Sequence, residues 1–168
     1  MPAWTRNLKS SASPEAAPRQ APAPAWAGQE IKPFVRGSYR QIVAARQGKP
    51  FIVTFWSLSC GYCKVELAML KKLAGKYPRL DLVLISTDTP EEEQLVSATL
   101  EKLASSKAEA WLFADSFAER LRFEVDRKWQ GELPRTYFFS AQGQVTAISG
   151  ELEQKDVEQW VKEQYAPG

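Results

Sequence analysis

Two nearly unbroken apolar runs, at residues 51–56 and 80–86, occupy the middle of the chain. The first reads Phe-Ile-Val-Thr-Phe-Trp, so β-branched and aromatic residues dominate it. Runs of this length and composition are typical of strands buried on both faces of a sheet. A shorter run at 110–113 predicts a third strand. Two further runs, at 136–139 and 145–148, flank a glycine-containing turn and predict an antiparallel hairpin.

Helical periodicity occupies the segments between these strands. Val65, Met69 and Leu73 recur every four residues, with Leu70 and Ala74 alongside, and predict an amphipathic helix over 61–77, directly after the first strand. Further helices are predicted to begin near Ser38, Thr89 and Ser116, and one more closes the chain. The other helical residues expected to face the core are Leu95, Val96, Leu100, Leu103, Phe117, Leu121, Val157, Trp160 and Val161. Helices alternate with strands until the hairpin, which predicts an α/β fold.

Residues 1–28 differ from the rest of the chain, because Ala, Pro and Ser dominate them and they show no hydrophobic periodicity. Repeated proline removes backbone donors and favours extended conformers. We therefore expect a largely disordered tether at 1–28 and one globular domain at 29–168. The composition fits a plain tail as well as a membrane spacer.

The charge balance argues against several classes of partner. The 168 residues carry 22 Lys and Arg against 20 Asp and Glu, a net charge of +2, and the two signs are interspersed. This balance gives no electrostatic reason to expect nucleic acid as a partner. No stretch approaches the roughly 20 continuous apolar residues that span a bilayer. No charged start followed by an apolar run marks a secretory signal, so we expect any signal or anchor to be missing from this chain.

The supply of reactive side chains is also restricted. Histidine is absent, and there are only two cysteines. This composition excludes Ser-His-Asp and Cys-His catalysis. A structural zinc site takes four Cys or His ligands, so zinc here would need carboxylates or a second subunit. We expect neither a metal ion nor a cofactor.

The two cysteines, Cys60 and Cys63, enclose Gly61 and Tyr62 where the first strand passes into a helix. Unpaired N–H groups at a helix start favour a thiolate, and Cys60 gains most from them. Thiols in such motifs have pKa values of roughly 3.5–7.5 rather than ~8.5. We expect the Cys60 thiolate to attack a disulfide on a partner protein and Cys63 to resolve the mixed disulfide. An upstream electron donor must then reduce the pair again.

Two other interpretations of the cysteine pair are a structural staple and half of a zinc site. A disulfide that closes so short a loop constrains the unfolded chain little and so adds little stability, which argues against a purely structural role. The position of the pair between an apolar strand and an amphipathic helix favours redox chemistry over the zinc half-site.

Leu133 and Pro134 form the second candidate feature, just ahead of the strand at 136–139. Proline takes a cis peptide bond at low cost, and a cis bond here would turn the backbone towards the cysteines. We predict that Pro134 is cis and that its backbone neighbours pair with an extended segment of the partner. An ordinary trans proline is the alternative.

Residues 55–64, which contain the cysteine pair, and 133–136, which read Leu-Pro-Arg-Thr, resemble the thioredoxin superfamily. The helix and strand expected between Pro90 and Phe113 are similar to those of its extracytoplasmic TlpA/ResA/CcmG branch, and the likeness runs from about residue 31 to 165. It implies a thioredoxin-like fold, with a central mixed β-sheet flanked by helices. The inserted helix and strand would lie between the second core strand and the following helix.

The resemblance also implies roles for individual residues. Cys60 would be the nucleophile, Cys63 the resolving cysteine and Pro134 the cis proline. The implied substrate-binding residues are Trp56, Gly61, Tyr62 and Leu133. Glu66 and Leu67 match the Cys-Arg/Lys-x-Glu-Leu/Met pattern of the branch.

Three features, at four positions, depart from the superfamily. Thr54 stands where cytoplasmic thioredoxins carry a buried acid, so proton handling for Cys63 must use water or another group. Ala68 replaces the usual helix proline, which predicts a straighter helix. The Gly61-Tyr62 dipeptide resembles that of the periplasmic isomerase DsbC, which leaves the direction of electron flow open.

The expected function is reduction of disulfides in extracytoplasmic protein partners, for example in cytochrome c maturation. A membrane or soluble electron donor would act upstream, and the N-terminal segment would serve as a possible membrane tether. A periplasmic thiol oxidase or disulfide isomerase is the enzymatic alternative. A non-catalytic module that binds metal through two thiolates, or acts as an adaptor, is the alternative from another class. A cytosolic location also stays open.

Overall fold

The computed structural model of the protein describes residues 30–165. The expected tether at 1–28 lies outside the described residues. The elements in chain order are β1 (Ile31–Phe34), α1 (Ser38–Ala44), β2 (Phe51–Trp56), α2 (Gly61–Lys76), β3 (Leu82–Ser86), the 3-10 turn η1 (Pro90–Glu92), α3 (Glu93–Leu103), β4 (Glu109–Phe113), α4 (Ala118–Val125), β5 (Arg135–Phe139), β6 (Val145–Ser149) and α5 (Gln154–Tyr165).

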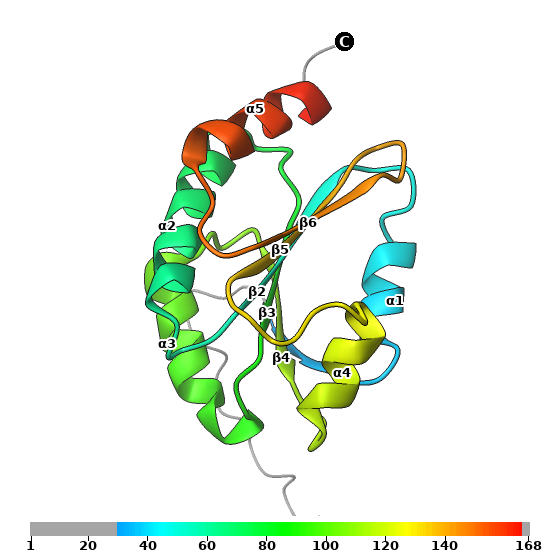
Figure 1. Cartoon of the computed structure of the whole chain (residues 1–168). Helices are drawn as coiled ribbons and strands as arrows, with labels where there is room; N and C mark the ends of the chain where they lie inside the picture. Colours follow the sequence, from blue (N-terminus) through cyan, green and yellow to red (C-terminus); the bar gives the residue numbers. More distant parts are fainter. Residues whose placement is uncertain (1–29, 166–168) are drawn as a thin grey trace, which may run out of the picture.

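One six-stranded sheet forms the centre, in the order β1-β4-β3-β2-β5-β6. The first four of these strands are mutually parallel, and β5 runs antiparallel to both β2 and β6. Helices α2, α3 and α5 cover one face, and α1 and α4 cover the other (Figure 1). This is the predicted mixed α/β sheet, with α3 and β4 as the inserted helix and strand.

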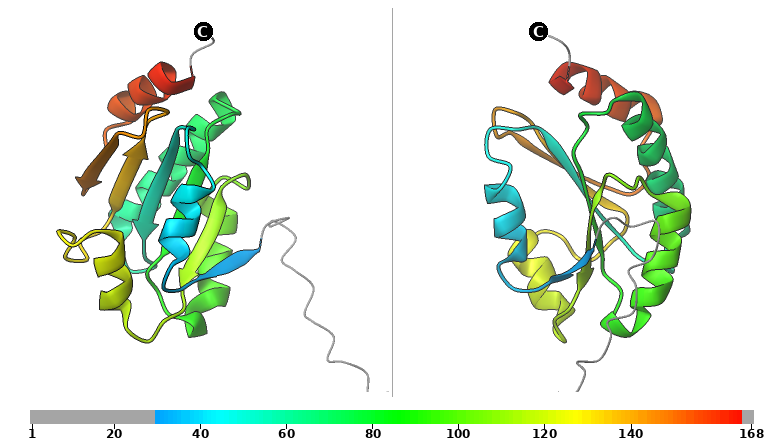
Figure 2. Two further views of the ribbon diagram at one scale, coloured as in Figure 1. Left: turned by 90° about the vertical axis from the view of Figure 1, so that its right-hand side faces the viewer. Right: turned by 180° about the vertical axis from the view of Figure 1, so that it is seen from behind.

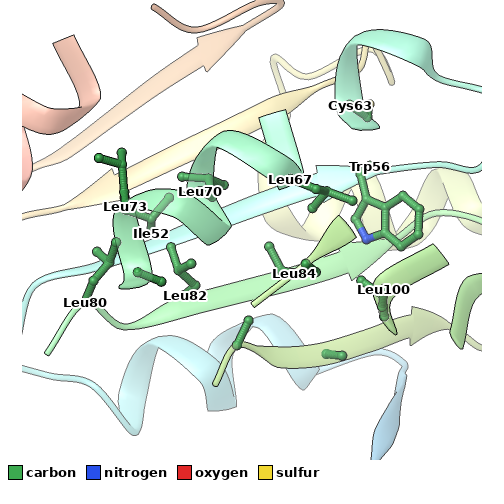
Figure 3. Packing of buried hydrophobic residues seen from close by; sticks show 14 of the residues in the cluster. Ile52, Trp56, Cys63, Leu67, Leu70, Leu73, Leu80, Leu82, Leu84 and Leu100 are labelled. Atoms are coloured by element: carbon green, nitrogen blue, oxygen red, sulfur yellow. The ribbon is translucent and has the colours of Figure 1, made fainter. Parts of the chain in front are cut away.

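Strand β2 divides its side chains between the two faces, because successive residues of a strand point in opposite directions. Ile52 and Trp56 join the apolar cluster under α2, α3 and α5, which Figure 3 shows from close by. Phe51, Val53 and Phe55 join the cluster under α1 and α4. Every residue of β2 is buried, as the unbroken apolar run predicted.

The structure corrects several expectations about which residues face the core. Val65, Leu95 and Phe117 are 61%, 62% and 58% exposed, so the predicted inward positions were wrong for these three. In α2 the predicted Leu70, Leu73 and Ala74 are buried, and Cys63, Glu66 and Leu67 complete the buried side. The periodicity misplaced the three exposed residues because each helix has apolar residues on two neighbouring sides. Either side fits a four-residue spacing, so the spacing alone does not identify the buried one.

The N-terminal end of the domain also differs from the prediction. Strand β1 was not predicted; it pairs in parallel with β4 at the edge of the sheet and contains Pro33. Ser38 was expected to cap α1, but the N-cap is Gly37, with φ of +87°. The Ser38 hydroxyl instead accepts a hydrogen bond from Val35 N–H. A proline is tolerated in an edge strand, where one backbone donor can stay out of the ladder.

Candidate active site

Cys60 and Cys63 lie at the N-terminus of α2, directly after the turn that follows β2. Their Cα atoms are 5.3 Å apart, and the two sulfurs form a disulfide bond. Cys60 is the N-cap of the helix, and its Sγ accepts a hydrogen bond from Cys63 N–H at 3.2 Å. The cysteine pair therefore sits where orphan backbone donors gather, as the sequence predicted.

The two sulfurs differ in access to solvent. Cys60 is partly exposed, whereas Cys63 is fully buried in the same apolar cluster as Trp56 and Leu67 (Figure 3). A large partner can therefore reach Cys60 but not Cys63. Of the two cysteines, Cys60 is therefore the accessible one.

Residues 57–59, the turn before Cys60, are hydrogen-bonded to residues at and just beyond the end of the neighbouring strand β3. The Asp88 carboxylate accepts a hydrogen bond from Leu58 N–H at 3.0 Å, and Asp88 N–H donates to Ser86 Oγ at 3.1 Å. Thr87 N–H donates to the Trp56 carbonyl at 2.9 Å. These bonds fix the turn from both of its flanks.

Glu66 places a carboxyl group in the interior one helical turn after Cys63. Its side chain is 3% exposed. Oε1 accepts a hydrogen bond from Thr136 Oγ1 at 3.1 Å, and Oε2 has no partner among the described residues. Burial raises the pKa of Glu66 to about 7, and the single Thr136 hydrogen bond offsets little of that rise.

Position 54 carries threonine and no acid, so the nearby Glu66 is the carboxyl group to consider for exchanging a proton with Cys63. Thr54 and Thr136 face each other across β2 and β5, on the side of the sheet that α2 covers. Thr54 Oγ1 also lacks a partner among the described residues. Residues three apart share one face of a helix, so Glu66 and Cys63 point the same way. The buried acid on this side of the site is therefore Glu66, on the helix, and the strand carries Thr54 instead.

The peptide bond between Leu133 and Pro134 is cis, which confirms the prediction. Pro134 is buried and Leu133 is half-buried, at the end of the segment between α4 and β5. The Pro134 carbonyl accepts a hydrogen bond from Gly150 N–H at 2.8 Å. Trp129, in the same segment, packs its ring 4.6 Å from that of Phe55.

Arg135 ties this segment together from the residue after Pro134. Its guanidinium donates to Asp126 Oδ2 at 2.7 Å, to Ser149 Oγ at 2.7 Å and to Tyr137 Oη at 3.0 Å. Only 11% of its side chain is exposed. Because Asp126 lies at the start of the segment and Ser149 ends β6, one side chain connects three parts of the chain.

The predicted substrate-binding residues fall into two groups. Gly61 and Tyr62 are exposed beside Cys60, with Tyr62 65% exposed, and Leu133 is partly accessible. Trp56 is fully buried in the apolar cluster that also contains Cys63, because this last residue of β2 points into the core. Its part in substrate binding stays a prediction.

Sequence reasoning missed the roles of Glu66, Arg135 and Asp88. For Glu66 a signal existed, since an acid three residues after Cys63 shares its face of the helix. For Arg135 and Asp88 no local signal marks the role, because it comes from hydrogen bonds to distant parts of the chain. In the described part of the chain, His, Cys, Asp and Glu form no group of three or more that could hold a metal ion.

The model of the AhpC/TSA family matches residues 21–148. A secreted disulfide oxidoreductase of Mycobacterium tuberculosis, homologous to E. coli DsbE, is 22% identical; the match covers 71% of this chain and 85% of that one, with a TM-score of 0.55. A thioredoxin-family thiol:disulfide interchange protein of Chlorobium tepidum is 20% identical over 73% and 84% of the two chains, with a TM-score of 0.57.

StoA from Bacillus subtilis is 20% identical over 68% and 84% of the two chains, with a TM-score of 0.50. None of the curated proteins gives a significant match. The structural likenesses confirm the thioredoxin-like fold that the sequence resemblance implied. Among residues 30–165, no helix has both the length and the apolar character needed to cross a bilayer.

Proposed function

The chain belongs to the AhpC/TSA family, and from that premise we propose that it is a thiol–disulfide oxidoreductase that reduces disulfides in protein partners outside the cytoplasm. One observation carries the proposal. A partly exposed Cys60 at a helix N-terminus is bonded to a buried Cys63. Structural disulfides gain from closing long loops, whereas this one spans three positions and leaves one sulfur accessible.

The reaction transfers two electrons from the Cys60/Cys63 dithiol to the partner. The Cys60 thiolate attacks one sulfur of the partner's disulfide, a mixed disulfide forms, and the partner's other sulfur leaves as a thiolate. Cys63 then loses its proton and attacks Cys60 Sγ. The second sulfur of the partner leaves as a thiolate and takes up a proton, and the Cys60–Cys63 disulfide remains.

The site contains groups that can stabilise a thiolate at Cys60 and then remove the proton from Cys63. Cys63 N–H already donates to Cys60 Sγ, so a thiolate at Cys60 would keep this hydrogen bond and gain from the helix dipole. Cys63 lies in an apolar cluster that disfavours its thiolate. Glu66, with its pKa raised to about 7, is suited to accept the Cys63 proton near neutral pH.

The partner would bind where accessible groups surround Cys60. Gly61 and Tyr62 lie on one side, and Leu133 is the partly accessible residue before Pro134. The Pro134 carbonyl is already used by Gly150, so an extended partner segment would pair with the backbone of Leu133. Pro134 would then shape this site without a hydrogen bond of its own to the partner.

The direction of electron flow separates the proposal from its enzymatic alternative, a thiol oxidase or isomerase. The Gly61-Tyr62 dipeptide is the feature that favours the alternative. The reduction potential of the Cys60/Cys63 couple, titrated against glutathione, distinguishes them. A value near the roughly −270 mV of thioredoxin supports a reductase, and a value near the roughly −120 mV of DsbA contradicts it.

A trapping experiment tests whether the chain turns over at all. Cys63→Ser leaves Cys60 free to attack but removes the sulfur that releases the partner, so mixed disulfides should accumulate through Cys60. Cys60→Ser is the matched control and should trap none, because Cys63 is buried. A metal-binding or adaptor module would give no trapped partner with either variant.

The extracytoplasmic location rests on the resemblance to the TlpA/ResA/CcmG branch and on a secreted structural relative. A membrane or soluble donor would restore the dithiol in that compartment, and residues 1–28 would act as the tether. Cytochrome c maturation is one process that would supply such disulfides. Cell fractionation of the full-length protein tests the location, and recovery in the cytosol would contradict it.

A further inference from the structure

Four arginines surround an open hollow of about 860 Å³ between α1 and α4. Arg36 belongs to the turn before α1, Arg40 to α1, Arg120 to α4, and Arg127 to the segment after α4. The two helices lie side by side on the same face of the sheet, on the side away from α2 (Figure 2, left). We call this surface the arginine face.

The arginines of this face lack ion pairs of the kind that Arg46 and Arg135 form. Arg46 and Arg135 each contact two carboxylates. Within residues 30–165, none of the four arginines of the arginine face has a carboxylate oxygen within 4.0 Å. Two glutamates also line the hollow, but Glu124 is engaged by Gly37 N–H at 2.6 Å. The lining thus presents four cations against two anions.

Two exposed phenylalanines stack with these cations: Phe123 lines the hollow itself, and Phe117 lies outside its lining but contacts Arg120. Phe117 and Phe123 are each 58% exposed. The Arg120 guanidinium lies 4.7 Å from the Phe117 ring centre, and that of Arg127 lies 5.2 Å from the Phe123 ring centre. Stacking restricts a guanidinium while its N–H edge stays free to bind a carboxylate with two hydrogen bonds. Arginine and aromatic residues are also the types enriched in the centres of protein interfaces.

We propose that the arginine face binds an acidic segment of a partner protein, with carboxylates on the guanidinium groups and an apolar side chain against the exposed phenylalanines. The charge of the four unpaired arginines is complementary to such a segment. A hollow between two helices accommodates an inserted chain better than the plane of a bilayer. The net charge of only +2 gives the protein little overall electrostatic attraction to nucleic acid. The proposal does not depend on the redox function.

Binding of a defined peptide tests this proposal. The probe is a synthetic peptide without cysteine in which Glu and Asp alternate with Phe, and its neutral counterpart carries Gln and Asn at the acidic positions. Affinity for the full-length protein is measured by calorimetry or fluorescence anisotropy at several salt concentrations. The acidic peptide should bind, affinity should fall as salt rises, and the neutral peptide should bind at least about tenfold more weakly.

The decisive variant replaces Arg36, Arg40, Arg120 and Arg127 by Gln and should lose about tenfold or more in affinity. The matched control replaces four exposed lysines on the other side of the sheet or at its ends by Gln, so the net charge changes equally: Lys71, Lys72, Lys102 and Lys162. It should keep the wild-type affinity. Phe123→Ser leaves every charge in place and should weaken binding several-fold, which covers the case that the quadruple variant fails to fold.

Several results would overturn the proposal. They are no binding of the acidic peptide, equal binding of the neutral peptide, and an equal loss in the lysine control. Vesicles of phosphatidylcholine and phosphatidylglycerol test the alternative occupant. If they bind through the same arginines while the acidic peptide does not, the face is a lipid-binding surface and the proposal is wrong.

Discussion

Glu66 is an ionisable side chain enclosed by apolar residues, and it ties the stability of the protein to pH. Its pKa is raised from 4.5 to about 7 by burial. Because the folded state holds this proton more tightly than the unfolded chain, the stabilising contribution is fully present below about pH 4.5. It is lost as the pH rises through about 7. The loss is on the order of 3 kcal/mol if the whole shift acts on folding.

We predict that Glu66→Gln removes this pH dependence. Gln keeps an oxygen that can accept the Thr136 hydrogen bond but carries no titrating proton. The free energy of unfolding of the oxidised protein is measured in urea from pH 4.5 to 8. As the pH rises, the value for the variant should increase relative to that of the wild type. Glu101→Gln, which removes an exposed carboxylate from α3, is the control. Parallel curves for wild type and Glu66→Gln would contradict the prediction.

Arg135 acts on the active site without touching the cysteines. Burial alone would raise the pKa of the Asp126 carboxyl, but hydrogen bonds from Lys128 N–H, Arg135 and Tyr137 hold this pKa below its usual value. The Arg135 guanidinium is thus one of the groups that keep Asp126 charged and the segment before Pro134 closed against β6. Loss of a bond to a charged, part-buried group costs about 1–3 kcal/mol.

We predict that Arg135→Met destabilises the protein by about 1–3 kcal/mol and slows reduction of a protein disulfide such as insulin several-fold. Alkylation of reduced Cys60 by iodoacetamide should proceed at the wild-type rate, because a small reagent does not need the Leu133 surface. Arg79→Met, at an exposed arginine with one hydrogen bond to the Tyr165 carbonyl, is the control. Equal slowing of insulin reduction and alkylation would mean that Arg135 acts on Cys60 itself.

At the scale of residues, the sequence identified those whose role is local. Cys60, Cys63 and Pro134 are marked by short motifs between recognisable elements. Glu66 becomes a buried acid only because Thr136, 70 positions later, meets it across the core. Asp88 holds Leu58 from 30 positions away. A role that arises from such pairings is absent from any single segment of sequence.

At the scale of elements, β2 couples the core to the site through its aromatic residues. Phe55 lies near the end of β2 that leads to the cysteines, and its ring contacts that of Trp129 in the Pro134 segment. Phe51 lies at the other end of the same face and stacks on Phe139, with ring centres 4.2 Å apart. The two phenylalanines are therefore a matched pair that differs mainly in distance along the strand from the site.

We predict that Phe55→Leu and Phe51→Leu each destabilise the protein by about 1–3 kcal/mol, because aromatic contacts are lost and buried volume changes shape. Only Phe55→Leu should also slow the reaction with a protein disulfide, since only Phe55 supports Trp129. Urea unfolding and insulin reduction measure the two effects. If both variants slowed the reaction equally, the effect would be one of general stability.

The elements themselves could be predicted wherever hydrophobic pattern and length agreed. The runs at β2, β3 and the β5–β6 hairpin were placed within one or two residues, and α2 was predicted over nearly its whole length. Strand β1 was missed because four residues with a central proline carry almost no period-two signal. Leu95 was placed inside because the N-terminal turn of α3 has apolar residues at neighbouring positions, and only packing decides between them.

At the scale of the molecule, the sheet joins two apolar clusters into one folding unit. Ile52 and Trp56 of β2 enter one cluster, and Val53 and Phe55 enter the other, so neither cluster can form without the same strand. We therefore predict a single unfolding transition in urea, with coincident curves from tryptophan fluorescence and far-ultraviolet circular dichroism.

Two variants, one on each side of the sheet, test this single transition. Leu70→Ala, on the α2 side, should lower the midpoint by the equivalent of about 2–5 kcal/mol and leave the slope unchanged. Phe55→Leu, on the α4 side, should lower the midpoint by less and also leave the slope unchanged. Two separate transitions, or a shift in only one spectroscopic signal, would show that the faces fold independently. Because Glu66 reaches the active site from one face and Arg135 from the other, such independence would also uncouple proton transfer from partner binding.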